Sequence, residues 1–250
     1  MADRERLDKL LVSKGIAETR EKARAFILCG AVLVDGKKAG KAGTLVSKEA
    51  SITVVESALP LGGRRFASRG GLKLEPAMEF FGLDAAGRIA VDIGASTGGF
   101  TDCLLQRGAE KVYAIDVGYG QLAWNLRQDP RVVVMERTNI RNLDTGQLAG
   151  SADLIVIDVS FISLKKVLPK AMDLLKSDGK ILALVKPQFE AGRGEVGKGG
   201  IVRDPETRLA AVEKIREFAE GIGLIMTGRL ESPLPGRDGN VEYFLLLCPE

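Results

Sequence analysis

Apolar residues in the first part of the chain recur with the period of a helix and then with that of a strand. The leucines of 7–11 predict one helix, and Thr19 is placed as the N-cap of a second. Apolar runs over 32–34 and 51–55 predict strands, with Asp35-Gly36 as a hairpin turn. Two helices and a small sheet make a compact α+β unit.

From residue 89 onwards, apolar β-branched runs alternate with helical stretches, notably 162–175 and 204–220. The candidate strands are 89–94, 111–116, 131–136, 152–160, 180–187, 224–230 and 241–248. This alternation predicts a doubly wound, Rossmann-like α/β sheet preceded by the small α+β unit. We place the first domain at 1–59, a linker at 60–67 and the second domain at 68–250.

The net charge of +3 is unevenly distributed along the chain. Residues 1–75 hold 15 Lys and Arg against 9 Asp and Glu, whereas the remainder holds 21 against 24. A basic N-terminal segment followed by a nearly neutral remainder indicates an N-terminal module that binds a polyanion. A basic surface that serves only solubility is the alternative.

Composition excludes several kinds of chemistry. The chain has no histidine, so a Ser-His-Asp triad and histidine-ligated metals are excluded. Its three cysteines are scattered, which predicts neither a disulfide framework nor a zinc site. No apolar run approaches the roughly 20 residues of a membrane span, and the charged start lacks a secretion signal. We therefore expect a cytoplasmic protein without metal or membrane partners.

The strand predicted at 89–94 ends in a glycine-rich turn that opens a helix. Such a turn lets a ligand approach the backbone, and the helix N-terminus offers free amides. The candidate cofactor-binding residues in and after this turn are Gly94, Ala95, Ser96, Gly98, Gly99 and Phe100.

Two acidic residues narrow the choice of cofactor. Asp116 ends the second strand, where it can accept hydrogen bonds from ribose hydroxyls. Asp92 precedes the first glycine, where it would repel a diphosphate but suit an ammonium group. Together with a turn that is not G-x-G-x-x-G, these acids favour S-adenosylmethionine over a dinucleotide. Further candidates for this site, at or after strand ends, are Val117, Asn139, Ile140 and Asp158.

Ionisable residues also stand at the ends of apolar strands. Asp158 and Lys186 end neighbouring strands, and Glu242 interrupts the final one. Burying an ionised group costs free energy, so such groups are expected to form ion pairs or to have a catalytic role. Structural ion pairs are the alternative for each residue taken singly.

The first 55 residues carry motifs that resemble the alpha-L RNA-binding domain of a ribosomal protein. The resemblance rests on "RLD", "TREKA", "VDG" and "K.G". It implies a module that grips folded RNA through phosphates and shape. The basic candidates for RNA contact on this module and just after it are Arg4, Arg6, Lys9, Arg20, Lys22, Arg24, Arg65 and Arg69.

The whole chain resembles FtsJ-type ribose 2′-O-methyltransferases of the TlyA (hemolysin A) family. The motifs that carry the resemblance are "SRGGLKL", "VDIGASTGGFTDCLL", "AIDVG", "DVSFISL", "LVKPQFE", "GEVGKGGIVRDP" and "SPLPGRDGNVEYF". It implies methyl transfer from S-adenosylmethionine to a ribose, that of a cytidine, in ribosomal RNA of one or both subunits. It also implies a catalytic tetrad of Lys73, Asp158, Lys186 and Glu242.

In that tetrad, we expect Asp158 and Glu242 to hold Lys186, which orients the hydroxyl and eases its deprotonation, while Lys73 stabilises developing negative charge. Whether Lys186 acts as a base or as an electrostatic partner stays open. The competing hypotheses are an RNA-binding ribosome-assembly factor without catalysis, and, less favoured, a membrane-active haemolysin. Asp92 and the glycine pattern argue against a nicotinamide oxidoreductase.

Overall fold

The structure is a computed structural model that describes residues 3–55, 65–192, 194–197, 199–236 and 238–250. The chain divides into two compact units, Met1–Arg69 and Gly70–Glu250. Residues 60–64 of the expected linker lie outside the described residues. Each unit has its own hydrophobic core.

The described residues of the N-terminal unit form two helices, as the sequence pattern predicts, and two small sheets, whereas the pattern predicts one. Its elements are β1 (Arg4–Arg6), α1 (Leu7–Ser13), α2 (Arg20–Leu28), β2 (Val32–Val34), β3 (Lys37–Lys38), β4 (Leu45–Ser47) and β5 (Ile52–Val54). Thr19 caps α2 by accepting a hydrogen bond from the Lys22 N–H at 3.2 Å. Asp35 and Gly36 both have positive φ, 49° and 76°, as a tight hairpin between β2 and β3 requires.

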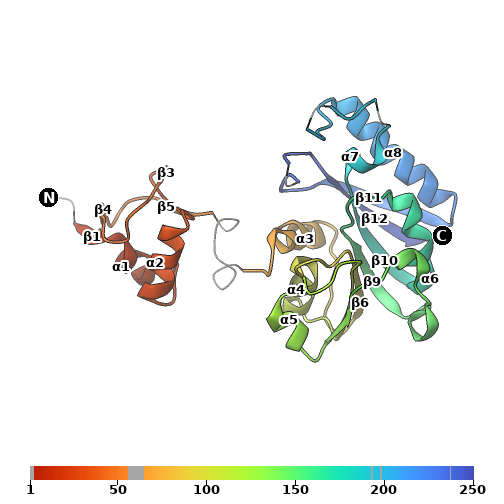
Figure 1. Ribbon diagram of the computed structural model, residues 1–250, viewed down its shortest axis with the longest axis horizontal. Coiled ribbons are helices and arrows are strands. Elements are labelled where there is room, and N and C mark those ends of the chain that lie inside the picture. The colour runs from red at the N-terminus through yellow and green to blue at the C-terminus, as the bar shows by residue number, and fades with distance from the viewer. Residues whose placement is uncertain (1–2, 56–64, 193, 198, 237) are drawn as a thin grey trace. The chain divides into compact units, whose positions relative to one another are not determined.

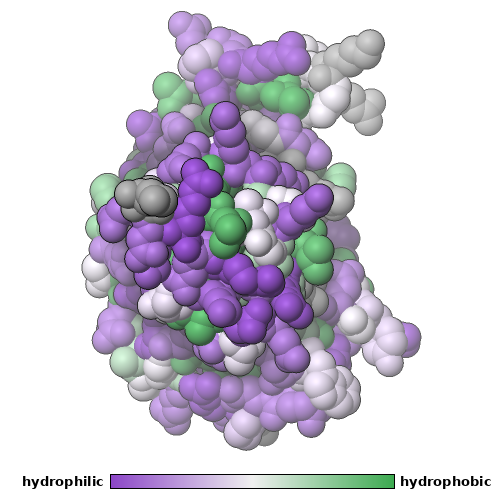
Figure 2. Space-filling view, turned by 90° about the vertical axis from the view of Figure 1, so that its left-hand side faces the viewer, coloured by the Kyte–Doolittle hydropathy of each residue, from purple (hydrophilic) through white to green (hydrophobic). Residues whose placement is uncertain are grey.

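Apolar residues of both helices and of β2 form the core of this unit. Leu7, Leu11 and Ile27 are almost completely buried against one another. The strands β3-β2-β5 form one antiparallel sheet, and β1 pairs with β4 in another, a pairing that the sequence pattern did not predict. The surface seen in Figure 2 is mostly hydrophilic, with small hydrophobic patches between the polar side chains.

The C-terminal unit is built on a seven-stranded sheet with the order β11-β12-β10-β9-β6-β7-β8. Its strands are β6 (Ile89–Ile93), β7 (Lys111–Ile115), β8 (Val132–Met135), β9 (Ala152–Ile157), β10 (Leu175–Val185), β11 (Leu224–Glu231) and β12 (Tyr243–Pro249). The five strands from β8 to β10 are parallel, and β12 is antiparallel to both its neighbours. The predicted doubly wound α/β fold is confirmed.

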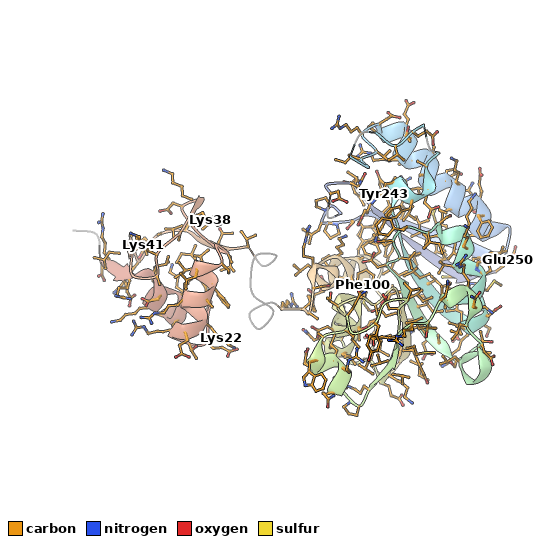
Figure 3. The ribbon with its side chains drawn as sticks, in the orientation of Figure 1. Lys22, Lys38, Lys41, Phe100, Tyr243 and Glu250 are labelled. Carbon is orange, nitrogen blue, oxygen red and sulfur yellow. The ribbon has the colours of Figure 1, made fainter. Side chains whose placement is uncertain are left out.

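Helices cover both faces of this sheet (Figure 1). They are α3 (Arg69–Phe80), α4 (Gly99–Gln106), α5 (Trp124–Gln128), α6 (Leu168–Leu174), α7 (Pro187–Glu190), α8 (Pro205–Glu220), and the 3-10 turns η3 (Ile140–Asn142), η4 (Gly146–Leu148) and η5 (Leu164–Lys166). Residues of α6 and α8 pack with alternate strand residues, including Ile157, Val185 and Tyr243, in one core cluster. On the other face, the ring of Phe100 from α4 stacks on Phe244 of β12, with centroids 6.2 Å apart; Figure 3 labels Phe100 and the adjacent Tyr243.

Several expected strand boundaries were wrong; β9, for example, ends at Ile157 and not at residue 160. The strand β10 begins at Leu175, five residues earlier than predicted, with a register shift before Lys180 that the apolar pattern does not reveal. The last strand begins at Tyr243, so Glu242 precedes it and does not interrupt it. Among the helices that the structure describes, none is long and apolar enough to cross a membrane.

Candidate functional site

A cavity of about 430 Å³ opens at the carboxyl ends of β6, β7 and β9, three adjacent strands. Ligands of open α/β sheets bind at this edge. Seven of the residues predicted to bind the cofactor line the cavity, namely Gly94, Ser96, Asp116, Val117, Asn139, Ile140 and Asp158.

The turn after β6 brings two strand ends very close. Gly94 has a φ of +89°, and a Cβ at this position would lie 2.5 Å from the backbone oxygen of Asp158. Backbone cannot yield as a flexible side chain can, so only glycine fits here. Ser96 also has a positive φ, 48°, although it is not glycine.

Asp116 compensates for this strain by hydrogen bonding. Its Oδ2 accepts from the Ser96 N–H at 2.9 Å, and its Oδ1 accepts from the Gly118 N–H at 2.6 Å. The carboxylate therefore fixes the turn and the loop after β7 together. Each oxygen has a second lone pair with which it can accept from a ligand hydroxyl.

The other five predicted residues do not line the cavity, and these are Asp92, Ala95, Gly98, Gly99 and Phe100. Gly98 has a φ of +94° and precedes α4, where a Cβ would meet the side chains of Leu122 and Leu126. The Phe100 ring belongs to the core. These residues therefore belong to the backbone and packing around the turn and not to the wall of the cavity.

Asp92 is completely buried beside α4. Its Oδ2 accepts a hydrogen bond from the Thr101 hydroxyl at 2.7 Å, while its buried Oδ1 has no hydrogen-bond partner among the described residues. Burial raises the pKa of Asp92 to about 7, against the opposing effect of the Thr101 hydrogen bond; the negative charge of Asp158 adds to the rise. Asp92 therefore lies behind the glycine turn, outside the cavity, without a positive charge in the described part of the chain to compensate its burial.

Two ion pairs lie beside the cavity. Lys73 of α3 donates to Glu242 at 2.7 Å, and both side chains are buried. The Lys186 Nζ lies 2.6 Å from Asp158 Oδ1 and also donates to the Ser160 hydroxyl at 3.0 Å. The expectation that Glu242 holds Lys186 was wrong, because the ion pair of Glu242 is with Lys73.

The register of the sheet places these two pairs next to each other. Asp158, Lys186 and Glu242 each adjoin a strand residue that packs toward α6 and α8. Successive side chains along a strand alternate between faces, so these three project toward the α3 side, where Lys73 lies. Val185 pairs with Tyr243, which makes Lys186 and Glu242 neighbours across β10 and β12. Asp158 belongs both to the cavity wall and to an ion pair.

Three of the predicted RNA-binding residues converge on one acid in the N-terminal unit. Arg6, Arg20 and Arg24 all form ion pairs with the buried Asp8. The remaining five are spread over the surface near α1, α2 and the start of α3. Arg4 and Lys9 are exposed, Lys22 pairs with Glu18, Arg65 lies over the Phe66 ring, and Arg69 begins α3 half-buried.

Sequence reasoning missed three residues that hold these groups in place, namely Asp8, Thr101 and Ser160. Asp8 stands in the "RLD" motif and Thr101 in the helix after the glycine turn, so their positions were visible. Their partners were not, because each contact depends on how separate elements pack.

Comparison with known proteins identifies both units. Residues 66–248 match the FtsJ-like methyltransferase family, and residues 5–52 match the S4 domain. The fold and the site thus define a methyltransferase with a Rossmann-like sheet and an N-terminal S4 domain.

The chain is 50% identical to the 16S/23S rRNA (cytidine-2′-O)-methyltransferase TlyA of Mycobacterium tuberculosis, over 99% of this chain and 91% of that protein. It is 41% identical to Hemolysin A of Brachyspira hyodysenteriae, over 95% of this chain and 97% of that one. The solved structure of a candidate hemolysin from Streptococcus thermophilus has a TM-score of 0.74 and 41% identity, covering 100% of this chain and 90% of that one. The chain belongs to the TlyA (hemolysin A) family of FtsJ-like methyltransferases, as its motifs predicted.

Proposed function

We propose that the protein transfers a methyl group from S-adenosylmethionine to the 2′-hydroxyl of a cytidine ribose in ribosomal RNA. The observation that carries the proposal is the pair of neighbouring Lys–carboxylate contacts beside the cavity at the carboxyl ends of the parallel strands. The names of the relatives support the RNA and the sugar position.

The cavity fits the methyl donor. Glycine at position 94 leaves the backbone open to close approach, and Asp116 can accept from ribose hydroxyls. Asn139 and Ile140 line the same cavity, where we expect them to contact the adenine of the donor. The donor, when bound, supplies a methyl carbon on a sulfonium sulfur. A diphosphate ligand would place negative charge near Asp92 and Asp158.

The four ionisable residues account for activation of the hydroxyl. Asp158 holds the Lys186 ammonium at 2.6 Å, and Ser160 fixes its direction at 3.0 Å. Lys186 thereby orients the ribose hydroxyl for in-line attack and eases loss of its proton. Lys73, held by Glu242, stabilises negative charge that develops on the oxygen.

The N-terminal unit supports folded RNA as the substrate. It is an S4 domain with basic side chains that include the labelled Lys22 on α2, Lys38 on the hairpin and Lys41 in the loop between β3 and β4 (Figure 3). Positive charge on such a module binds phosphates irrespective of sequence. Docking by this unit would leave recognition of one nucleotide to the site on the C-terminal unit.

Replacing Lys186 with alanine tests the catalytic assignment. We expect Lys186→Ala to lower methyl transfer to ribosomal subunits by at least about 10³-fold, because both orientation and charge stabilisation are lost. Binding of the donor should stay within about threefold, which isothermal titration calorimetry measures. Transfer is followed with labelled donor, and the modified ribose is mapped by blocked alkaline cleavage.

A matched control is Lys170→Ala, which removes one positive charge from α6 on the opposite face of the sheet. Its activity should equal that of the wild type. Near-wild-type turnover by Lys186→Ala would remove the assignment of this lysine. A wild-type protein that binds donor and subunits without any transfer would instead favour an assembly factor.

A further inference from the structure

A fully buried carboxylate lies beneath the basic surface of the N-terminal unit. Asp8, in the first turn of α1, has no exposed surface. Its Oδ2 lies 2.9 Å from Arg6, 3.1 Å from Arg20 and 3.5 Å from Arg24. Arg6 also donates through Nε to Oδ1 at 3.0 Å, so its contact is bidentate.

The three arginines come from two separate elements. Arg6 ends β1, whereas Arg20 and Arg24 lie one turn apart on α2. All three side chains have a nitrogen within 3.5 Å of the same Asp8 oxygen. The three nitrogens must therefore lie close to one another. The Asp8 carboxylate therefore gathers three guanidinium groups into one compact cluster, which we call the arginine cluster.

The arginine cluster stays available to a ligand. The side chains of Arg6, Arg20 and Arg24 are 40%, 49% and 53% exposed. A guanidinium has five N–H donors, and Asp8 occupies at most two on any one of them. Three positive charges against one negative charge leave a local excess of two.

Hydrogen bonds from arginine lower the pKa of Asp8 far below its usual range, Arg6 contributing most, although burial opposes them. The carboxylate therefore stays ionised, and the cluster stays assembled, at neutral pH. A guanidinium that is already held loses less conformational entropy when it binds a phosphate.

We infer that Asp8 is a positioning residue for RNA binding, whose buried carboxylate presets Arg6, Arg20 and Arg24 as a site for phosphate groups of the RNA backbone. The inference rests on the proposed function, since it requires that this unit bind RNA. On this inference, the affinity for RNA depends on the fixed positions of the three guanidinium groups as well as on their positive charge.

The substitution Asp8→Asn separates these two contributions by the sign of its effect. It removes one negative charge at nearly constant volume, so charge alone predicts tighter binding of RNA. Loss of positioning predicts weaker binding, by about tenfold for one charge-assisted contact. The dissociation constant of the full-length protein is measured with purified small and large ribosomal subunits in separate titrations.

Glu18→Gln is the matched control. Glu18 forms an exposed ion pair with Lys22 at 2.6 Å, so this change alters the charge of the same unit equally without touching the arginine cluster. We expect its affinity to be unchanged or slightly higher. Asp8→Asn that remains folded and binds as tightly as Glu18→Gln would overturn the inference.

A second pair of variants decides the matter if Asp8→Asn does not fold, as circular dichroism would reveal. Arg20→Lys and Arg24→Lys keep both Asp8 and the charge but lose the planar fork of donors. Positioning predicts several-fold weaker binding for each with an unchanged salt dependence, whereas unchanged affinity would contradict it. If the wild type binds neither ribosomal subunit, the proposed function is contradicted. That outcome is distinct from the loss of the positioning role, which requires a wild type that binds.

Discussion

Asp8 and Asp92 are both completely buried carboxyl groups, yet their pKa values shift in opposite directions. Arginine side chains surround Asp8 and stabilise its charge. For Asp92, desolvation outweighs the hydrogen bonding by Thr101, so the protonated form is favoured. The partner, and not burial itself, decides which form of a buried acid is present.

The raised pKa of Asp92 predicts a stability that falls as pH increases. The unfolded carboxyl titrates near 3.8 and the folded one near 7, so between these values the folded state binds more protons. The stabilisation is complete below about pH 4 and is lost as pH rises through 7, by roughly 4 kcal/mol at most. We expect Asp92→Asn, which cannot ionise, to lack this dependence.

Urea unfolding of the full-length protein at pH 5 and pH 8 measures this effect. The free energy of unfolding of the wild type relative to Asp92→Asn should fall between these two values of pH. Asp153→Asn serves as the control, because the pKa of Asp153 is lowered and its carboxyl stays ionised throughout this range. Equal slopes for the wild type and Asp92→Asn would show that Asp92 does not titrate there.

At the scale of elements, the loop before β12 is shaped around the Glu242 carboxylate. A Cβ at Gly236 would lie 2.4 Å from Glu242 Oε1, whose partner oxygen accepts from Lys73. The Asn240 side chain joins this loop to the segment before α8, accepting from the Val202 N–H and donating to the Gly200 carbonyl, both at 2.9 Å. These contacts leave Glu242 little room to move.

We therefore expect Gly236→Ala to displace Glu242 from Lys73. The turnover number for methyl transfer should fall by about 10- to 100-fold, because a small misplacement of catalytic groups is costly. Donor affinity should not change. Gly194→Ala, where a Cβ meets nothing within 4 Å, is the control and should behave as the wild type in single-turnover assays. Full activity of Gly236→Ala would mean that the Lys73–Glu242 pair tolerates displacement.

At the scale of the whole molecule, the two units carry different charges. Residues 1–75 have a net charge of +6 and the remainder −3. The proposed binding of RNA by the basic unit would depend on release of counterions, whereas the proposed binding of a small donor in the cavity would not.

Salt should consequently weaken the two binding reactions unequally. Between about 50 and 200 mM salt, we expect the affinity for ribosomal subunits to fall by roughly 10- to 100-fold, as for three or so phosphate contacts. Donor affinity should change by less than about twofold. Fluorescence titrations of both ligands at each salt concentration test this. Equal salt dependence would contradict the division of tasks between the units.

Local features of the chain were predictable because they depend on neighbours in sequence. Thr19 as a helix cap, Asp35-Gly36 as a hairpin turn and the apolar strands of the sheet all follow from short-range sterics and periodicity. The glycine turn and Asp116 are one βαβ unit, so the cavity they line could be placed at the carboxyl ends of the strands. Motifs that resemble the family added the four candidate catalytic residues.

The sequence by itself thus determined the two modules, the doubly wound sheet and the types of residue at its functional edge. Only the tertiary structure decided how the charges pair, since Lys73 and Glu242 are 169 residues apart and meet through the antiparallel last strand and α3. It likewise turned Asp8 from an acid within a basic segment into the centre of three arginines. The physical reason is that periodicity fixes which face a side chain occupies, while the partner it meets there depends on the packing of distant elements.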